Sequence, residues 1–180
     1  SYTGMYGQVV SAYYRTDVEG AVLSMEKQTK TLNVGVTFDE VYIVPDYLSL
    51  TAVGGDVLFE MPSSYVATPI EVCADTPTGT WTALGNGAKT NIAEGTTLYL
   101  RTASDTALKR VFGGRTSFKM TSEDGGLVEL GGNAMTLLDR KGKSRTVGVD
   151  AFACLFEDCT NLVSVAEGLL PAENIASNCY

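Results

Sequence analysis

The side chains that could do chemistry in this chain are carboxylates, cysteines, lysines and tyrosines, because its 180 residues include no histidine. That absence excludes Ser-His-Asp and Cys-His nucleophile activation, histidine general-base catalysis and histidine-rich metal sites. Carboxylates are adjacent in sequence at Asp39-Glu40, Glu123-Asp124 and Glu157-Asp158. A glycosidase needs two carboxylates that face each other across a sugar, which neighbours in a turn seldom do. We therefore expect no catalytic residue and interpret the protein as non-enzymatic.

The four cysteines are the next candidates for a chemical role, and three of them fall in the last thirty residues. Cys154 and Cys159 are close in sequence, but no second close pair and no histidine is present to complete a tetrahedral zinc site. Small buried hydrophobic side chains are the usual alternative for such cysteines. We expect neither a metal nor another cofactor.

Two further stretches could bind a ligand. The basic run RKGKSR at Arg140–Arg145 could hold an anionic partner, although charges around a glycine in an acidic protein are typical of a solvated loop. Trp81 could stack on a sugar ring, although aromatic residues in strand-rich sequence usually pack in a core or across strands. Trp81 is thus the candidate glycan contact.

Charge and composition limit the partners. The formal net charge of -8 and a pI near 4.5 disfavour nucleic acid and anionic membrane surfaces, which would repel the chain. With 44% apolar residues the chain can build a folded core. No apolar window reaches the length that a membrane-spanning helix needs, about 18 residues, so we expect no membrane insertion.

Hydrophobic periodicity predicts a mainly β fold. Residues 32–38 alternate with period two up to a predicted turn at Asp39-Glu40, and two apolar runs flank Gly54-Gly55-Asp56, the composition of a hairpin turn. Short runs of this kind recur roughly every ten residues, which predicts an antiparallel, Ig-like β-sandwich over residues 32–138. Residues 1–31 fit either a short helix or an edge strand, and we interpret them as an N-terminal arm or docking segment.

The pattern changes in residues 139–180. Apolar side chains at spacings of three and four predict a helix that runs into a short strand at Leu162–Val165. A helix-plus-strand unit of this size cannot bury its own apolar face and must stack on a neighbour. The residues of the helical stripe are Phe152, Leu155, Phe156, Cys159 and Leu162.

These residues resemble the BspA-like leucine-rich repeat proteins, a family of gut Bacteroidetes and their phages. The family repeat runs approximately C-Y-x-x-M-F-x-x-C-T-x-L, then a hydrophobic stretch, then L-P-A and the next C-Y. Cys159, Thr160 and Leu162 match directly, Leu170 and Pro171 match the L-P-A, and Cys179 and Tyr180 open the next repeat. Ala151 and Phe152 replace the first Cys-Tyr, which suits a capping repeat. The segments GTWTALGNG, TTLYLRT and GGNAMTLL also resemble the β-rich domain that precedes such repeats.

The resemblance implies a β-rich domain followed by a leucine-rich-repeat solenoid, cut here at its first repeat junction. It also implies adhesion or protein interaction, by analogy with the fold. We expect an extracellular module at a bacterial cell surface, or a bacteriophage virion component such as a head fibre or tail appendage that docks by its N-terminal part. Its partners would be host-surface or virion proteins, with a symmetric homo-oligomer, such as a trimer, in the virion setting. The alternative is a carbohydrate-binding β-sandwich module.

Overall fold

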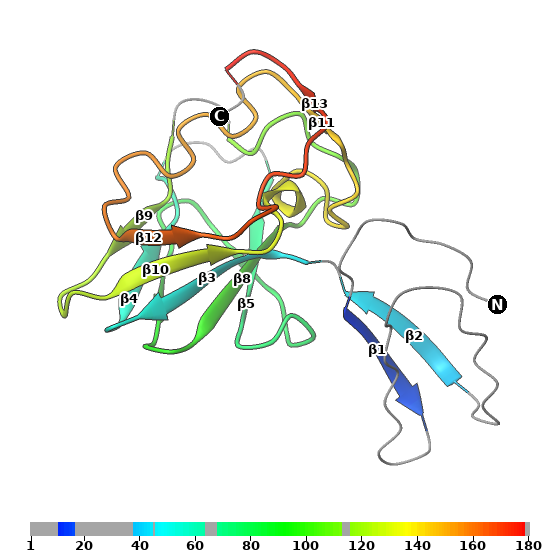
Figure 1. The fold of residues 1–180 in the computed structure, drawn as a ribbon, viewed down its shortest axis with the longest axis horizontal. Helices are drawn as coiled ribbons and strands as arrows, with labels where there is room; N and C mark the ends of the chain where they lie inside the picture. The colour runs from blue at the N-terminus through cyan, green and yellow to red at the C-terminus, as the bar shows by residue number, and fades with distance from the viewer. Residues whose placement is uncertain (1–10, 17–37, 45, 64–67, 113–115, 179–180) are drawn as a thin grey trace. The chain divides into compact units, whose positions relative to one another are not determined.

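The structure is a computed structural model of the chain, and it describes residues 11–16, 38–44, 46–63, 68–112 and 116–178 (Figure 1). The chain divides into two units, Ser1–Asp46 and Tyr47–Tyr180. In the first unit, β1 (Ser11–Thr16) pairs antiparallel with β2 (Phe38–Val44). The turn predicted at Asp39-Glu40 is wrong, because β2 continues through both residues into a β-branched and aromatic run that favours a strand. Of the strand predicted over residues 32–38, only Phe38, the first residue of β2, lies within the described residues.

The largest element of the second unit is a six-stranded sheet with the order β12-β10-β3-β8-β5-β6. Neighbouring strands are antiparallel except for β10 and β12, which run parallel. The sheet is therefore mixed, but its parallel strand β12 lies outside residues 32–138, and the strands within that predicted antiparallel stretch pair antiparallel. Its strands are β3 (Leu48–Val53), β5 (Ile70–Ala74), β6 (Thr82–Leu84), β8 (Thr97–Thr102), β10 (Leu127–Gly131) and β12 (Leu162–Val165).

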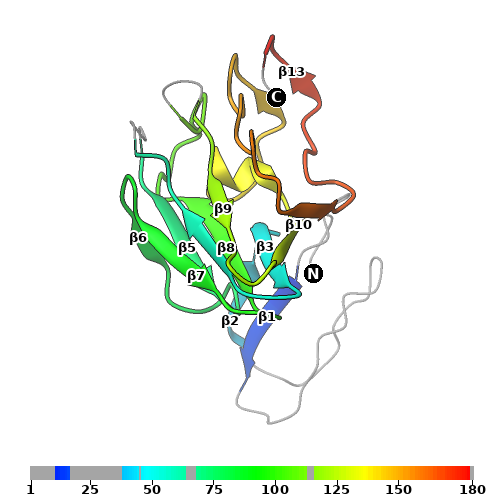
Figure 2. The ribbon, with the colours of Figure 1, turned by 90° about the vertical axis from the view of Figure 1, so that its left-hand side faces the viewer.

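A second sheet has three antiparallel strands, with β4 (Val57–Glu60) between β7 (Lys89–Ile92) and β9 (Lys119–Thr121). The hairpin predicted around Gly54-Gly55-Asp56 is wrong, because β3 and β4 belong to different sheets. A Cβ atom on Gly55 would lie 3.1 Å from the backbone nitrogen of Gly126, so this turn packs closely against a second loop. The glycines thus connect a strand of the six-stranded sheet to a strand of the three-stranded sheet. Figure 2 shows strands of both sheets, among them β3 and β8 of the first and β7 and β9 of the second.

One hydrophobic cluster receives side chains from both sheets. Along β3, buried Leu48, Leu50 and Ala52 alternate with less buried residues, as expected for a strand with one face in the core. From the three-stranded sheet, Phe59 is fully buried and its ring centroid lies 5.0 Å from that of Phe118. Each such side chain contributes roughly 1.5–3 kcal/mol relative to an exposed one. The predicted mainly β architecture is confirmed.

A short 3-10 helix, η1 (Ala134–Leu137), is the one helix among the described residues. Its N-cap is Asn133, whose side-chain oxygen accepts a hydrogen bond from the amide of Met135 at 2.9 Å. All four residues of η1 are buried, and Ala134, Met135 and Leu137 belong to the core cluster. In the part of the chain that the structure describes, no helix has the length and apolar character to cross a membrane.

The helix predicted from the stripe Phe152–Leu162 is wrong. This segment is a series of turns, in which the amides of Leu155 and Glu157 donate to the carbonyls three residues earlier at 3.0 Å. Left-handed backbone recurs at every fourth residue, with φ of 56° at Asp150, 63° at Cys154 and 63° at Asp158. A left-handed residue interrupts the i to i-4 ladder of an α-helix. Consecutive turns also place apolar side chains at spacings of three and four, so the sequence pattern does not distinguish them from a helix.

Candidate interaction surfaces

Residues 146–175, which we call the C-terminal coil, end beside the strand with which they begin. β11 (Thr146–Val147) pairs in parallel with β13 (Asn174–Ile175), in the register Thr146 with Asn174 and Val147 with Ile175. The turn that follows each strand repeats at the same offset, since Asp150 has φ 56° and Asn178 has φ 54°. The fourth residue after the start of each strand therefore has a left-handed backbone.

The coil is joined to the six-stranded sheet by β12, which lies beside β10 at the sheet edge (Figure 1). The amide of Val128 donates to the carbonyl of Asn161 at 2.8 Å, and the amide of Ala166 donates to that of Leu130 at 2.8 Å. Between β8 and β9, the amide of Val111 donates to the carbonyl of Ala151 at 2.9 Å. These bonds make the coil an extension of the β domain.

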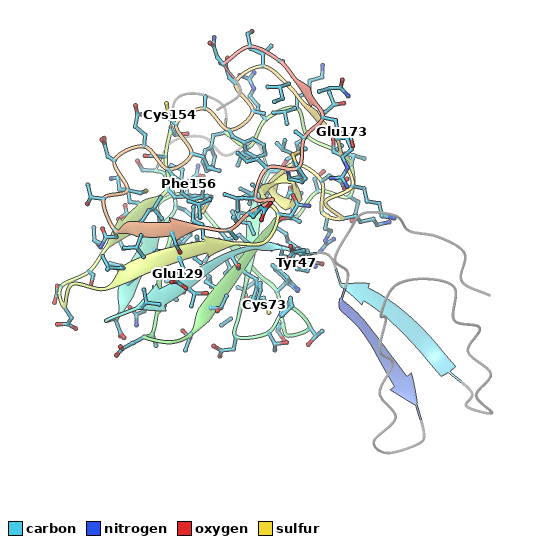
Figure 3. All side chains as sticks on the ribbon, in the orientation of Figure 1. Tyr47, Cys73, Glu129, Cys154, Phe156 and Glu173 are labelled. Carbon is cyan, nitrogen blue, oxygen red and sulfur yellow. The ribbon has the colours of Figure 1, made fainter. Side chains whose placement is uncertain are left out.

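The residues of the predicted repeat motif divide into an inner and an outer set. Phe152 and Leu155 are buried in the core cluster, and Phe156, Cys159 and Leu162 pack against it partly buried. The ring centroid of Phe156, which is labelled in Figure 3, lies 5.8 Å from that of Phe118. The outer set consists of exposed Thr160 and Leu170, with Pro171 half-buried beside them in sequence. Cys179 and Tyr180 lie outside the described residues.

The coil carries most of the large apolar side chains that the described residues expose. Ile175 is 59% exposed, whereas Val147, its parallel partner in β11, is 1% exposed. Val147 and Ile175 occupy equivalent positions in the coil, but only the Val147 side chain is buried. The other exposed apolar side chains of the coil are Val149, Val163, Val165 and Leu170.

Cys159 in the coil and Cys73 in β5 both have surroundings that disfavour the thiolate form. The thiol of Cys159 donates to the carbonyl of Phe118 at 3.2 Å, and burial, together with the neighbouring Asp158 charge, raises the pKa of that thiol. Burial likewise raises the pKa of Cys73 in β5. A raised pKa reduces the thiolate fraction, which is the nucleophilic form. These two thiols are therefore suited to packing.

The second candidate surface is centred on Trp81, directly before β6. The guanidinium of Arg101 lies 3.9 Å from the centroid of the indole ring, a cation–π contact. The Tyr47 ring packs edge-on at 4.7 Å, and the indole N–H donates to the carbonyl of Pro77 at 3.2 Å. Three contacts thus fix the orientation of an indole that stays partly exposed.

The basic loop at Arg140–Arg145 is tied down by acidic groups. The Asp139 carboxylate accepts backbone N–H bonds from Lys141, Lys143 and Ser144 at 3.0–3.1 Å. Arg140 pairs with Glu71 at 2.9 Å and with Asp105 at 3.1 Å. Only the Lys141 and Lys143 side chains of the four basic residues are exposed. Backbone hydrogen bonds to Asp139 and the two ion pairs of Arg140 therefore hold this loop against the rest of the fold.

Two of the three carboxylate pairs noted in the sequence lie on loops. Glu123 and Asp124 are exposed in the connection between β9 and β10, and Glu157 and Asp158 are exposed among the turns of the coil. Asp39 and Glu40 belong instead to the strand β2. The two loop pairs have the exposed positions expected of solvated turns.

Sequence reasoning missed the strands β11 and β13 and the equivalence of Val147 with Ile175. A signal was present, because the spacing from Ala151-Phe152 to Cys179-Tyr180 equals the spacing from Thr146 to Asn174. Applying that offset to neighbouring positions would have aligned TVGVDAF with NIASNCY. The pairing of Arg101 with Trp81 and Glu71 had no comparable signal, because the pairing of β5 with β8 creates it.

Comparison with known proteins gives no relative: no protein-family model matches the chain, and no curated protein or solved structure matches it. The family resemblance of the repeat motif therefore remains a prediction from the residues quoted for it.

Proposed function

We propose that this chain is a non-enzymatic recognition or structural module, in which a β-sandwich base leads into the first coil of a leucine-rich-repeat-like solenoid. The two sheets that share one hydrophobic cluster support the sandwich. The parallel return of β13 to β11 in the C-terminal coil supports the solenoid. In this proposal the turns at Asp150, Cys154 and Asp158 take the place of the helical segment of a repeat.

The observation that carries the proposal is the contrast between Val147 and Ile175. In a solenoid each coil covers the previous one, so equivalent positions are buried inside the array and exposed at its open end. Val147 is 1% exposed beside the strand that contains Ile175, which is itself 59% exposed. A further coil that stacked on β13 would bury the Ile175 side chain, just as the Val147 side chain is buried now.

Recognition follows from the same geometry, because stacked coils form extended binding surfaces for proteins. The setting is extracellular, either a bacterial cell surface or a virion, where host-surface or virion proteins are the partners. Top-down mass spectrometry of the native polypeptide separates the two settings. A signal-cleaved or lipidated start selects the cell surface, and co-purification of the unprocessed chain with phage particles selects the virion. Light scattering tests the homo-oligomer expected for a virion component.

The stacking itself is tested by adding a second copy of residues 151–178 directly after Asn178. If β13 is a stacking surface, the added copy folds onto it, the melting temperature rises and the amides of β13 become protected from hydrogen exchange. A matched control carries Asp at the Phe152 position of the added copy, where the native coil is buried. An added copy that stays protease-sensitive in both chains would contradict the proposal.

A further inference from the structure

The single tryptophan of the chain is held in a fixed orientation at the edge of the six-stranded sheet. Trp81 directly precedes the edge strand β6, and Arg101 reaches it from β8 with its guanidinium 3.9 Å from the indole centroid. Tyr47 packs edge-on, and the indole N–H is used by the carbonyl of Pro77. A guanidinium over the ring covers one face of the indole, and the side chain still remains partly exposed.

The support beneath the indole is itself held by ion pairs. Arg101 Nε donates to Glu71 Oε2 at 2.7 Å, and Arg140 donates to the same oxygen at 2.9 Å. Arg140 also pairs with the exposed carboxylate of Asp105. Two arginines are thus matched by two carboxylates. The position of Arg101 is fixed without leaving a net charge in this network.

From this geometry we propose that Trp81 is the stacking platform of a carbohydrate-binding site, and that its ligand is a neutral oligosaccharide. A preoriented aromatic ring presents apolar area at little entropic cost, which suits the C–H face of a pyranose. Exposed Thr78 follows Pro77, whose carbonyl accepts the indole N–H, and its hydroxyl can pair with a sugar hydroxyl. Uronic and sialic acids are disfavoured because the chain has a net charge of -8.

The site is independent of the C-terminal coil, so its test does not depend on the proposed function. Because Trp81 is the only tryptophan, its fluorescence reports directly on sugar stacking in the unmodified protein. The probes are cellohexaose, xylohexaose, mannohexaose and N-acetyllactosamine, with hexagalacturonate as the acidic comparison. We expect a saturable change in emission with at least one neutral sugar and none with hexagalacturonate.

The sugar that binds is then titrated by calorimetry into two variants. Trp81→Phe keeps a smaller ring and should weaken binding several-fold, whereas Trp81→Ala should weaken it at least about tenfold. Leu127→Ala is the control, because Leu127 is an exposed apolar residue in β10, which is separated from β6 by three strands in the strand order. It should bind as the unmodified chain does.

Two results would overturn the proposal. One is an unchanged emission spectrum with every neutral sugar at millimolar concentration. The other is binding that Trp81→Phe and Trp81→Ala leave unaltered. If Trp81→Ala fails to fold in a thermal scan, Trp81→Phe and the fluorescence of the unmodified chain still decide the outcome.

Discussion

The backbone amide of Leu48 donates a hydrogen bond to the hydroxyl of Thr136 at 3.1 Å, although 88 positions separate the two residues in the chain. Thr136 is fully buried, and its hydroxyl also lies 2.8 Å from the carbonyl of Asn133 and 3.2 Å from that of Leu100. The hydroxyl has one hydrogen to share between these carbonyls. A single side chain thus connects β3, β8 and the 3-10 helix η1.

Replacing Thr136 with valine should lower the free energy of unfolding by about 1–3 kcal/mol, because the buried amide of Leu48 then has no acceptor. Urea unfolding followed by circular dichroism measures the change. Thr136→Ser is the control, since it keeps the hydroxyl and removes only a methyl group. The explanation fails if serine proves the more damaging of the two substitutions.

Gly132 tests a second long-range contact of the same region. Its φ is 71°, and a Cβ atom built there would overlap the carbonyl oxygen of Tyr47. Gly125 has a similar φ of 80°, but its Cβ would meet open space. Gly125→Ala should therefore cost about 1–2 kcal/mol for the left-handed backbone alone. Gly132→Ala should cost clearly more, because the backbone of Tyr47 must also move, and thermal unfolding of both variants gives the comparison.

Local sequence pattern was sufficient to locate some of the strands. The strand Leu162–Val165 was predicted with the bounds that the structure gives, and buried residues alternate with less buried ones along β3 and β8. The pattern could not assign strands to sheets, since that depends on long-range pairing. This is why a crossover at Gly54-Gly55-Asp56 was interpreted as a hairpin.

The candidate sites were predictable to different degrees. Phe152 and Leu155 were identified by spacing, and the structure buries both, but in turns whose left-handed residues the spacing could not reveal. Strands of two residues, such as β11 and β13, are too short to show a period. The contact of Trp81 with Arg101 depends on strand pairing, so sequence reasoning identified Trp81 as a candidate without the residue that orients it.

Because Asp158 has a left-handed backbone, we expect this position to accept glycine better than a β-branched residue. Its φ is 63° and its side chain is exposed. Asp158→Gly should leave the free energy of unfolding unchanged or raise it slightly, because glycine adopts this backbone without steric cost. Asp158→Val should lower it by about 1–2 kcal/mol, because a β-branched residue is an outlier in this region. Chemical denaturation measures both, and equal effects of Gly and Val would refute a left-handed residue here.

Asp56 predicts a defined pH dependence. Its carboxylate accepts hydrogen bonds from the Asn91 side chain and the Glu94 amide, each at 2.9 Å, and these bonds hold its pKa below the ordinary value of 3.8. A lowered folded-state pKa means that the stabilisation is fully present above pH 3.8 and is lost as the pH falls through the folded-state pKa. The unmodified chain should therefore lose stability more steeply below this pH than Asp56→Asn does. Urea midpoints measured across this range should diverge, and parallel curves would exclude the effect.

The equivalence of Val147 and Ile175 gives the strongest test of the coil. In the chain as it stands, Val147→Asp should cost at least about 3 kcal/mol, because it buries an unpaired carboxylate, whereas Ile175→Asp should change stability by no more than about 0.5 kcal/mol. In the chain extended by a second copy of residues 151–178, Ile175 becomes an internal position. Ile175→Asp should then cost nearly as much as Val147→Asp. If Ile175→Asp remains neutral in the extended chain while the added copy is folded, β13 is not the surface on which a coil stacks.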